Sequence, residues 1–185
     1  MLIKLAAAFV IVIGAVLAFA ATRPDHFRIE RSITIQSAPE HVFPHISHFR
    51  AWEAWSPWEK LDSQIQKTYS GTPEGKGAIY EWSGNKDVGK GRMEITDAVA
   101  PSRLTIQLDF ITPFEAHNTV DFVLTPEGNS TRVTQAMHGP SPFVSKLMGL
   151  FFSIDKMVGD KYEEGLSSLK RVVETPAENP KAAGN

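Results

Sequence analysis

Between Ser63 and Gly139 the chain alternates apolar and polar residues almost without a break. A period of two places successive side chains on opposite faces of a β-strand. Turn-forming stretches such as "TPEG", "APS", "TPF" and "TPEGN" interrupt the alternation at short intervals. Strands joined by such short turns pair antiparallel, so the region predicts a meander of about six strands. The expected strand segments are 63–71, 76–84, 89–99, 102–111, 115–124 and 130–139.

A further strand and several helices are expected on either side of this meander. The segment "HFRIERSITIQ" (26–36) alternates in the same way, with Arg31 as a charged exception on its apolar side. The next segment, "SAPEHVFPHISHF" (37–49), predicts one or two short helices. Residues 141–174 predict one long amphipathic helix that begins near Ser141. Its apolar positions recur at steps of three and four: Val144, Leu147, Phe151, Ile154, Val158, Tyr162, Leu166, Leu169 and Val173.

These elements predict an α+β fold in which a seven-stranded antiparallel sheet wraps around the long C-terminal helix. The sheet has one apolar face to cover, and only the long helix is large enough to cover it. A twisted sheet does not close tightly on a single helix everywhere, so space is expected between them.

The two ends of the chain differ from this single domain, which is expected at 25–174. Residues 5–22 carry no charge and approach the length of a bilayer span, so residues 1–24 predict a membrane anchor. The expected location is a single-pass anchor, in a bacterial inner membrane, with the orientation open. A cleaved signal peptide is the alternative, because Ala18-Phe19-Ala20 resembles a cleavage site. The tail 175–185, rich in Pro, Ala and Gly, predicts disorder.

Composition excludes several classes of function. The formal net charge of −2 and the pI near 6.3 give no basic face for nucleic acid. The chain has no Cys, which rules out disulfides, thiolate metal sites and cysteine nucleophiles. No cofactor is expected, and the sequence leaves the oligomeric state open.

Several stretches together resemble the helix-grip (START-like, SRPBCC) superfamily, and most closely its bacterial polyketide cyclase/dehydrase-like branch. The resemblance covers about residues 27–174. It rests on "RSITIQSAPEHVFPHI", "WEAWSPW", "YEWSGNKDVGKGRMEI", "STRVTQAMHG" and "GDKYEEGLSSLKRVVE". It implies the helix-grip fold and a cavity for a hydrophobic small molecule, but no single activity. Gln135 stands where many relatives have an aromatic residue, which implies a more polar cavity.

The candidate site is the inward face of the sheet. Counting by twos along each strand places a mostly apolar set with a few polar members on that face, as small-molecule pockets require. A solid core with mutually satisfied polar groups is the alternative. The inward set is Ala78, Tyr80, Trp82, Met93, Ile95, Leu104, Ile106, Leu108, Phe110, Asn118, Val120, Phe122, Leu124, Val133, Gln135 and Met137. The candidate ligand-binding residues are Trp82, Tyr80, Gln135, Phe110, Phe122, Met137, Asn118, Arg31, Trp52 and Trp58.

Three tryptophans lie close together in "FRAWEAWSPWEK". Trp55 is expected to seal the open end of the sheet against the long helix, so its role is structural. Trp52 and Trp58 are expected to shape the mouth of the cavity or to touch lipid headgroups.

No catalytic or metal site is assembled by the sequence. Glu81, Glu94 and Asp121 alternate to the outer face, as do His117 and His138, and no catalytic residue is assigned. The glycines of "GNKDVGKG" predict a hairpin loop instead of a phosphate-binding loop.

The histidines of "HVFPHISH" have coordination-like spacing. Because His41, His45 and His48 lie opposite the apolar side of their helix, we expect them on a solvent face without metal.

Three functions are consistent with these features. The first is a membrane-tethered, non-enzymatic binding protein for a hydrophobic or amphiphilic, lipid-like molecule. The second is a cyclase/dehydrase-type enzyme in which Gln135, Tyr80 and Arg31 orient a polyketide-like substrate. The third is a protein-interaction module resembling Hsp90-activator relatives, with an exposed apolar patch.

Overall fold

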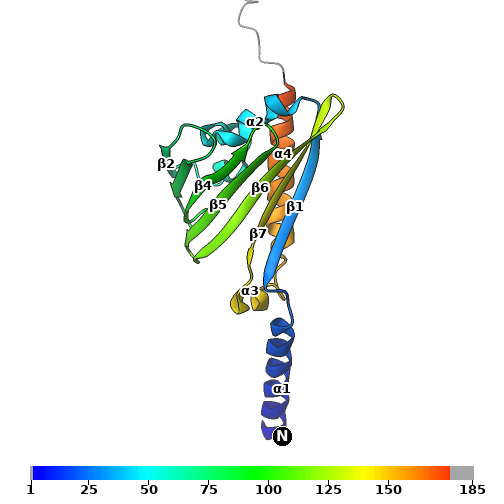
Figure 1. Ribbon diagram of the computed structural model, residues 1–185. Coiled ribbons are helices and arrows are strands. Elements are labelled where there is room, and N and C mark those ends of the chain that lie inside the picture. Colours follow the sequence, from blue (N-terminus) through cyan, green and yellow to red (C-terminus); the bar gives the residue numbers. More distant parts are fainter. Residues whose placement is uncertain (1, 176–185) are drawn as a thin grey trace, which may run out of the picture.

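The computed structural model describes residues 2–175, without the side chains of residues 2, 3, 6 and 7. It contains one seven-stranded antiparallel sheet in the order β1-β7-β6-β5-β4-β3-β2, which confirms the predicted strand number and the meander from β2 to β7 (Figure 1). The sheet is completed by β1, which pairs with β7. The strands are β1 His26–Ile35, β2 Gln66–Gly71, β3 Ala78–Ser83, β4 Lys90–Val99, β5 Arg103–Thr112, β6 Ala116–Glu127 and β7 Ser130–Pro140. The tail predicted to be disordered lies, apart from Thr175, outside the described residues.

Helices precede, interrupt and follow the strands in sequence. They are α1 Leu2–Ala21, α2 Pro39–Ser47, the 3-10 helices η1 Phe49–Ala54 and η2 Pro57–Lys60, α3 Phe143–Met148 and α4 Ile154–Glu174. The helix α4 lies along the sheet beside β1, and α2 with η1 and η2 lies near its C-terminal end (Figure 1). The chain thus has the helix-grip arrangement expected from the sequence.

The inward face of the sheet contains the residues predicted for it. All of the residues in the inward set above are buried except Phe110, which is partly buried. The period of two in the sequence therefore gave the correct face on every strand from β3 to β7.

The prediction of one long helix from Ser141 was wrong. The chain forms α3 and then α4, and residues 149–153 between them are not α-helical. The Ser153 side chain caps α4 by accepting a hydrogen bond from the Lys156 backbone N–H at 3.1 Å. Because the chain changes direction before this cap, Val144 and Phe151 are 66% and 70% exposed instead of buried. Only the α4 part of the apolar stripe covers the sheet.

The membrane span expected at the N-terminus is not found. Residues Leu2–Ala21 are helical, but within residues 2–175 no helix has the length and apolarity needed to cross a bilayer.

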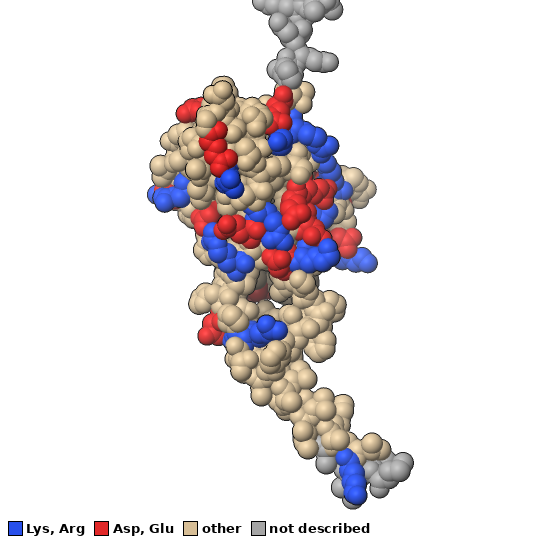
Figure 2. Space-filling view, turned by 90° about the vertical axis from the view of Figure 1, so that its right-hand side faces the viewer, with Lys and Arg blue, Asp and Glu red and all other residues tan. Residues whose placement is uncertain are grey.

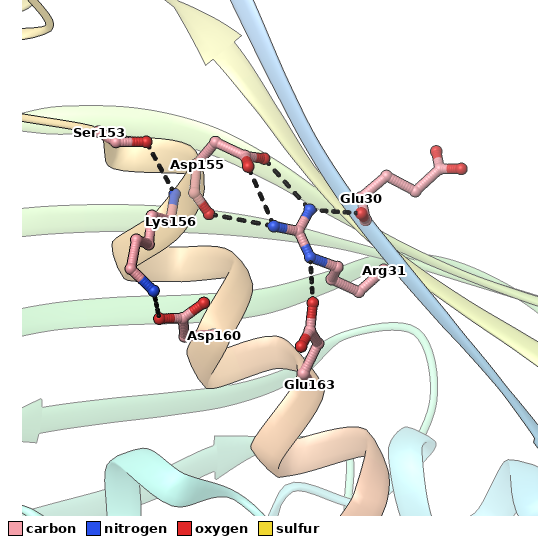
Figure 3. A network of polar contacts seen from close by, with 7 residues as sticks. All are labelled: Glu30, Arg31, Ser153, Asp155, Lys156, Asp160 and Glu163. Carbon is pink, nitrogen blue, oxygen red and sulfur yellow. Dashed lines mark hydrogen bonds and ion pairs between the residues drawn. The ribbon is translucent and has the colours of Figure 1, made fainter.

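Arg31 joins β1 to α4 through a network of ion pairs (Figure 3). Its Nε donates to Glu163 Oε1 at 2.7 Å, and its Nη2 donates to Asp155 Oδ2 at 3.0 Å. The guanidinium crosses α4 directly over Gly159, where any Cβ atom would collide with it. Asp155 and Glu163 raise the pKa of Arg31, and the hydrogen bond from Arg31 lowers the pKa of Asp155. The charged exception of the β1 pattern is therefore a contact between sheet and helix.

We expect Asp155→Asn to lower the melting temperature at neutral pH because it removes the charged partner of Arg31. Since the folded-state pKa of Asp155 is below its unfolded value of about 3.9, the stabilisation is present above that pH. It is lost as the pH falls through the lowered folded-state pKa. Thermal unfolding of wild type and variant from pH 7 down to pH 3 should therefore show a difference that shrinks in acid.

Asp160→Asn is the matched control, because the salt bridge that Asp160 makes among the described residues stays within α4, with Lys156 at 2.7 Å. An exposed pair four residues apart contributes little. A loss for Asp160→Asn equal to that for Asp155→Asn would contradict the role given to Arg31.

Two of the clustered tryptophans are anchored in the core. Trp55 is 2% exposed, and its indole N–H donates to the His45 carbonyl at 2.9 Å. Its ring lies close to Gly165 of α4 and edge-on to Phe122 at 6.3 Å between ring centroids. Trp52 is 6% exposed and donates to the Ile46 carbonyl at 3.0 Å. Trp55 thus occupies the position predicted for it, between the sheet and the long helix.

Trp55→Ala should cost about 3–5 kcal/mol of unfolding free energy, the usual cost of emptying a large aromatic site in a core. Trp58, which is 38% exposed, is the control, and Trp58→Ala should cost about 1 kcal/mol. Urea denaturation followed by circular dichroism measures both. Equal losses for the two variants would show that Trp55 has no special structural role.

Candidate functional site

An apolar cavity of about 170 Å³ lies between the sheet and α4. Its walls come from β3 to β7, from the segment that contains η1 and η2, and from Val158, Lys161, Tyr162 and Gly165 of α4. Two lining residues, Trp58 and Asp87, are exposed, and Lys161 is partly exposed, so the opening lies between η2, the β3–β4 loop and α4. The space expected between sheet and helix is therefore present.

The aromatic wall of the cavity is centred on Trp82. Its indole N–H donates to the Val88 carbonyl in the β3–β4 loop at 3.0 Å. Its ring packs edge-on against the ring of Phe110, with 6.1 Å between the ring centroids. The ring lies over Gly91 of the neighbouring strand, where a Cβ atom would collide with it. The "GNKDVGKG" segment is the predicted hairpin loop, and it additionally holds this wall in place.

A buried carboxylate that sequence analysis missed lies beside the opening. The Glu59 side chain is 8% exposed, and its Oε1 accepts a hydrogen bond from the Tyr80 hydroxyl at 3.0 Å. Its Oε2 receives no directed hydrogen bond, but the Lys67 ammonium lies against it as an ion pair. Lys67 also pairs with Glu53 Oε1 at 3.0 Å. Because η2 has no extended periodic pattern, no signal in the sequence placed Glu59 inside.

Burial and these carboxylates shift the pKa values of nearby groups. Burial, followed by the negative charge of Glu59, raises the pKa of Tyr80 well above its ordinary range. Burial together with Glu53 raises the pKa of Tyr69, stacked on Tyr80, to about 12. Burial acts to lower the pKa of Lys67, but its two carboxylate partners outweigh that effect and the net shift is upward. Both tyrosines therefore stay neutral hydroxyls at physiological pH.

Gln135 and Tyr162 form the polar part of the inner wall. Gln135, on β7, is 5% exposed, and Tyr162, on α4, is 5% exposed. Burial raises the pKa of Tyr162, and a hydrogen bond from Gln135 acts in the opposite direction. The Oε1 atom of Gln135 has no hydrogen-bond partner among the described residues.

Seven of the candidate ligand-binding residues line the cavity: Trp82, Tyr80, Gln135, Phe110, Met137, Trp52 and Trp58. The structure does not bring the other three there. Phe122 is fully buried behind the wall, packed edge-on against Trp52 at 5.9 Å. Asn118 is buried beneath Gly139, and Arg31 is engaged with α4. Gln135, Tyr80 and Arg31 therefore do not converge as the cyclase alternative requires.

The histidines do not form a metal site. Within residues 2–175, no group of three or more His, Asp or Glu side chains is arranged to hold a metal ion. His117 pairs with Asp109 at 2.7 Å and His138 with Asp121 at 3.0 Å, both on the outer face of the sheet. The Asp109 partner raises the pKa of His117.

A seven-stranded antiparallel sheet wrapped around one long helix defines the class of helix-grip domains. Residues 26–174 match the family model described as "Polyketide cyclase / dehydrase and lipid transport". The chain belongs to this family. A search of the curated proteins finds no match.

Solved structures show the same fold at low sequence identity. The di-domain aromatase/cyclase BexL from the BE-7585A biosynthetic pathway matches with a TM-score of 0.61 and 11% identity, over 86% of this chain and 54% of that one. Protein CV1439 from Chromobacterium violaceum matches with a TM-score of 0.57 and 14% identity, over 83% of this chain and 99% of that one. The Aha1 dimer from Colwellia psychrerythraea matches with a TM-score of 0.56 and 18% identity, over 80% of this chain and 96% of that one. At these identities the likeness establishes the fold alone.

Proposed function

We propose that the protein is a non-enzymatic binding protein that holds a hydrophobic small molecule in the cavity between the sheet and α4. The observation that carries the proposal is the cavity itself, with its wall of Trp82, Phe110, Met137 and Val120. Apolar walls with a few polar groups favour an apolar ligand body and fix its orientation. Family membership supports the same ligand class.

The volume of the cavity limits the size of the ligand that it can hold. A cavity of about 150 Å³ accommodates benzene in other proteins, so about 170 Å³ suits a ligand body of one or two rings or a short chain. A lipid with two long acyl chains would leave most of its length outside the opening. The bound portion is therefore a compact apolar group, whether it is the whole ligand or the end of a lipid-like one.

Filling the cavity should weaken ligand binding. Leu108→Trp puts an indole into the cavity, because Leu108 lines it on β5. We expect the variant to weaken naphthalene binding at least about tenfold. Quenching of tryptophan fluorescence or calorimetry measures the dissociation constant.

Gln107→Trp is the matched control on the adjacent, outward-facing position of the same strand, and it should bind as wild type does. Wild-type protein that binds no naphthalene, or equal loss in both variants, would contradict the proposal.

We further propose that the domain is located at a lipid surface through α1 and the neighbouring segment 143–153. Four successive residues of α1, Phe9, Val10, Ile11 and Val12, are each 60–70% exposed. Because successive helical residues point about 100° apart, their side chains surround the helix. A groove on a partner protein covers one side of a helix, whereas lipid covers all of it. Figure 2 shows charged side chains gathered over the globular part, while α1 carries none beyond Lys4, near its N-terminal end.

The segment 143–153 continues this apolar surface. It packs beside α1, and its only charged residue, Lys146, pairs with Asp25 at 2.5 Å. Phe151 and Phe152 are 70% and 68% exposed. Exposed aromatic side chains of this kind suit the boundary between lipid headgroups and acyl chains. An exposed apolar patch is also consistent with the protein-interaction alternative. The experiment below distinguishes contact with lipid from contact with a protein partner.

A polarity-sensitive nitrobenzoxadiazole label at Phe152→Cys should shift its emission to the blue when the full chain is reconstituted in phosphatidylcholine/phosphatidylglycerol vesicles. The chain has no other cysteine, so the label is unique. Val99→Cys, in an exposed position on β4, is the control and should keep a water-like emission. A water-like emission at both positions would exclude lipid contact and leave a protein partner.

The intact mass of the protein from cells distinguishes an anchor from a cleaved signal peptide.

A further inference from the structure

The amide of Gln135 is only partly satisfied inside an apolar cavity. It lies on β7 with Met137 and Val120 beside it in the wall, and it is 5% exposed. Its Oε1 has no hydrogen-bond partner among the described residues. A buried acceptor without a partner is destabilising, whereas an apolar residue of the same shape would not be.

The other polar groups around the cavity engage one another. The Tyr80 hydroxyl donates to Glu59, and Glu59 is paired with Lys67. Gln135 Oε1 is therefore an open acceptor at the inner wall, while the charges lie beside the opening. A ligand that enters with a hydrogen-bond donor on its inner end meets this oxygen.

We infer that the ligand is an uncharged alcohol or phenol whose hydroxyl donates to Gln135 Oε1 while its apolar body fills the cavity. This inference rests on the proposed binding function and specifies its ligand class. The charge of the ligand follows from the surroundings of the site. The charged residues that line the cavity, Glu59, Asp87 and Lys161, lie beside the opening, so an anionic or a cationic group at Gln135 would be buried among apolar walls without a counter-ion. A neutral hydroxyl supplies the missing hydrogen-bond donor without burying a charge.

The test compares three ligands of similar size on the full-length protein: p-cresol, which donates; p-xylene, in which a methyl group replaces the hydroxyl; and 4-methylanisole, which only accepts. Calorimetry gives each dissociation constant for wild type and for Gln135→Met, a substitution close in shape. We expect the preference for p-cresol over p-xylene to fall about tenfold or more in Gln135→Met, because the recognised acceptor is gone. Binding of p-xylene should be retained or improved.

The control variant is Gln107→Met, the same substitution on the outward face of β5, which should leave the preference unchanged. Thermal melts establish that each variant is folded, and the wild-type comparison alone tests the inference if Gln135→Met is not. Equal preference in wild type and Gln135→Met, with p-xylene still bound, would overturn the hydroxyl inference and leave the proposed function standing. A Gln135-dependent preference for 4-methylanisole would overturn it too, by showing that the amide N–H is the recognised group. Failure of all three ligands to bind would overturn both.

Discussion

One helix must cover a sheet that is seven strands wide, and the rest of this structure follows from that mismatch. The helix α4 makes its main sheet contact with β1 at one edge, and it meets η1, η2 and α2 at the other side. The inner face of β3 to β5 is therefore covered by short 3-10 helices and by aromatic side chains. A twisted sheet cannot follow a straight helix across its whole width, so the cavity lies where neither helix nor strand fills the space.

Small residues determine where the helix and the sheet approach closely. At Gly159 the absence of a side chain lets the Arg31 guanidinium lie across α4, and at Gly165 a Cβ atom would lie only 3.0 Å from Pro57 Cδ. These two contacts fix the helix to β1 and to the tryptophan segment. Gly91 has the corresponding role in the sheet, because it leaves room for the ring of Trp82. The close contacts and the open space are thus set by the same few positions.

The polar groups around the cavity divide into two kinds. Glu59, Tyr80 and Lys67 satisfy one another and so define a fixed, charged rim. Gln135 lines the cavity with Tyr162, and its amide oxygen has no partner among the described residues. A rim of paired charges favours the entry of neutral molecules, and an open acceptor on the inner wall favours those with a donor at one end. The site is therefore expected to select a ligand both by its apolar body and by the position of its hydrogen-bond donor.

The sequence by itself determined the strands and the side chains on the inner face, because alternation with a period of two is a local property of each strand. The short turns between strands determined the antiparallel meander, whereas the pairing of β1 with β7 came from the tertiary structure. It also placed Trp55 and named the superfamily. It did not determine the break between α3 and α4, because the helical spacing of apolar residues continues through Phe151 although the chain there leaves the sheet. It placed Arg31 on the inner side of β1 without revealing Asp155 and Glu163, which lie 124 and 132 residues away in the chain. It missed Glu59 altogether. Whether a polar residue meets a partner, a ligand or solvent depends on which distant segments the fold brings together, and only the tertiary structure decided that.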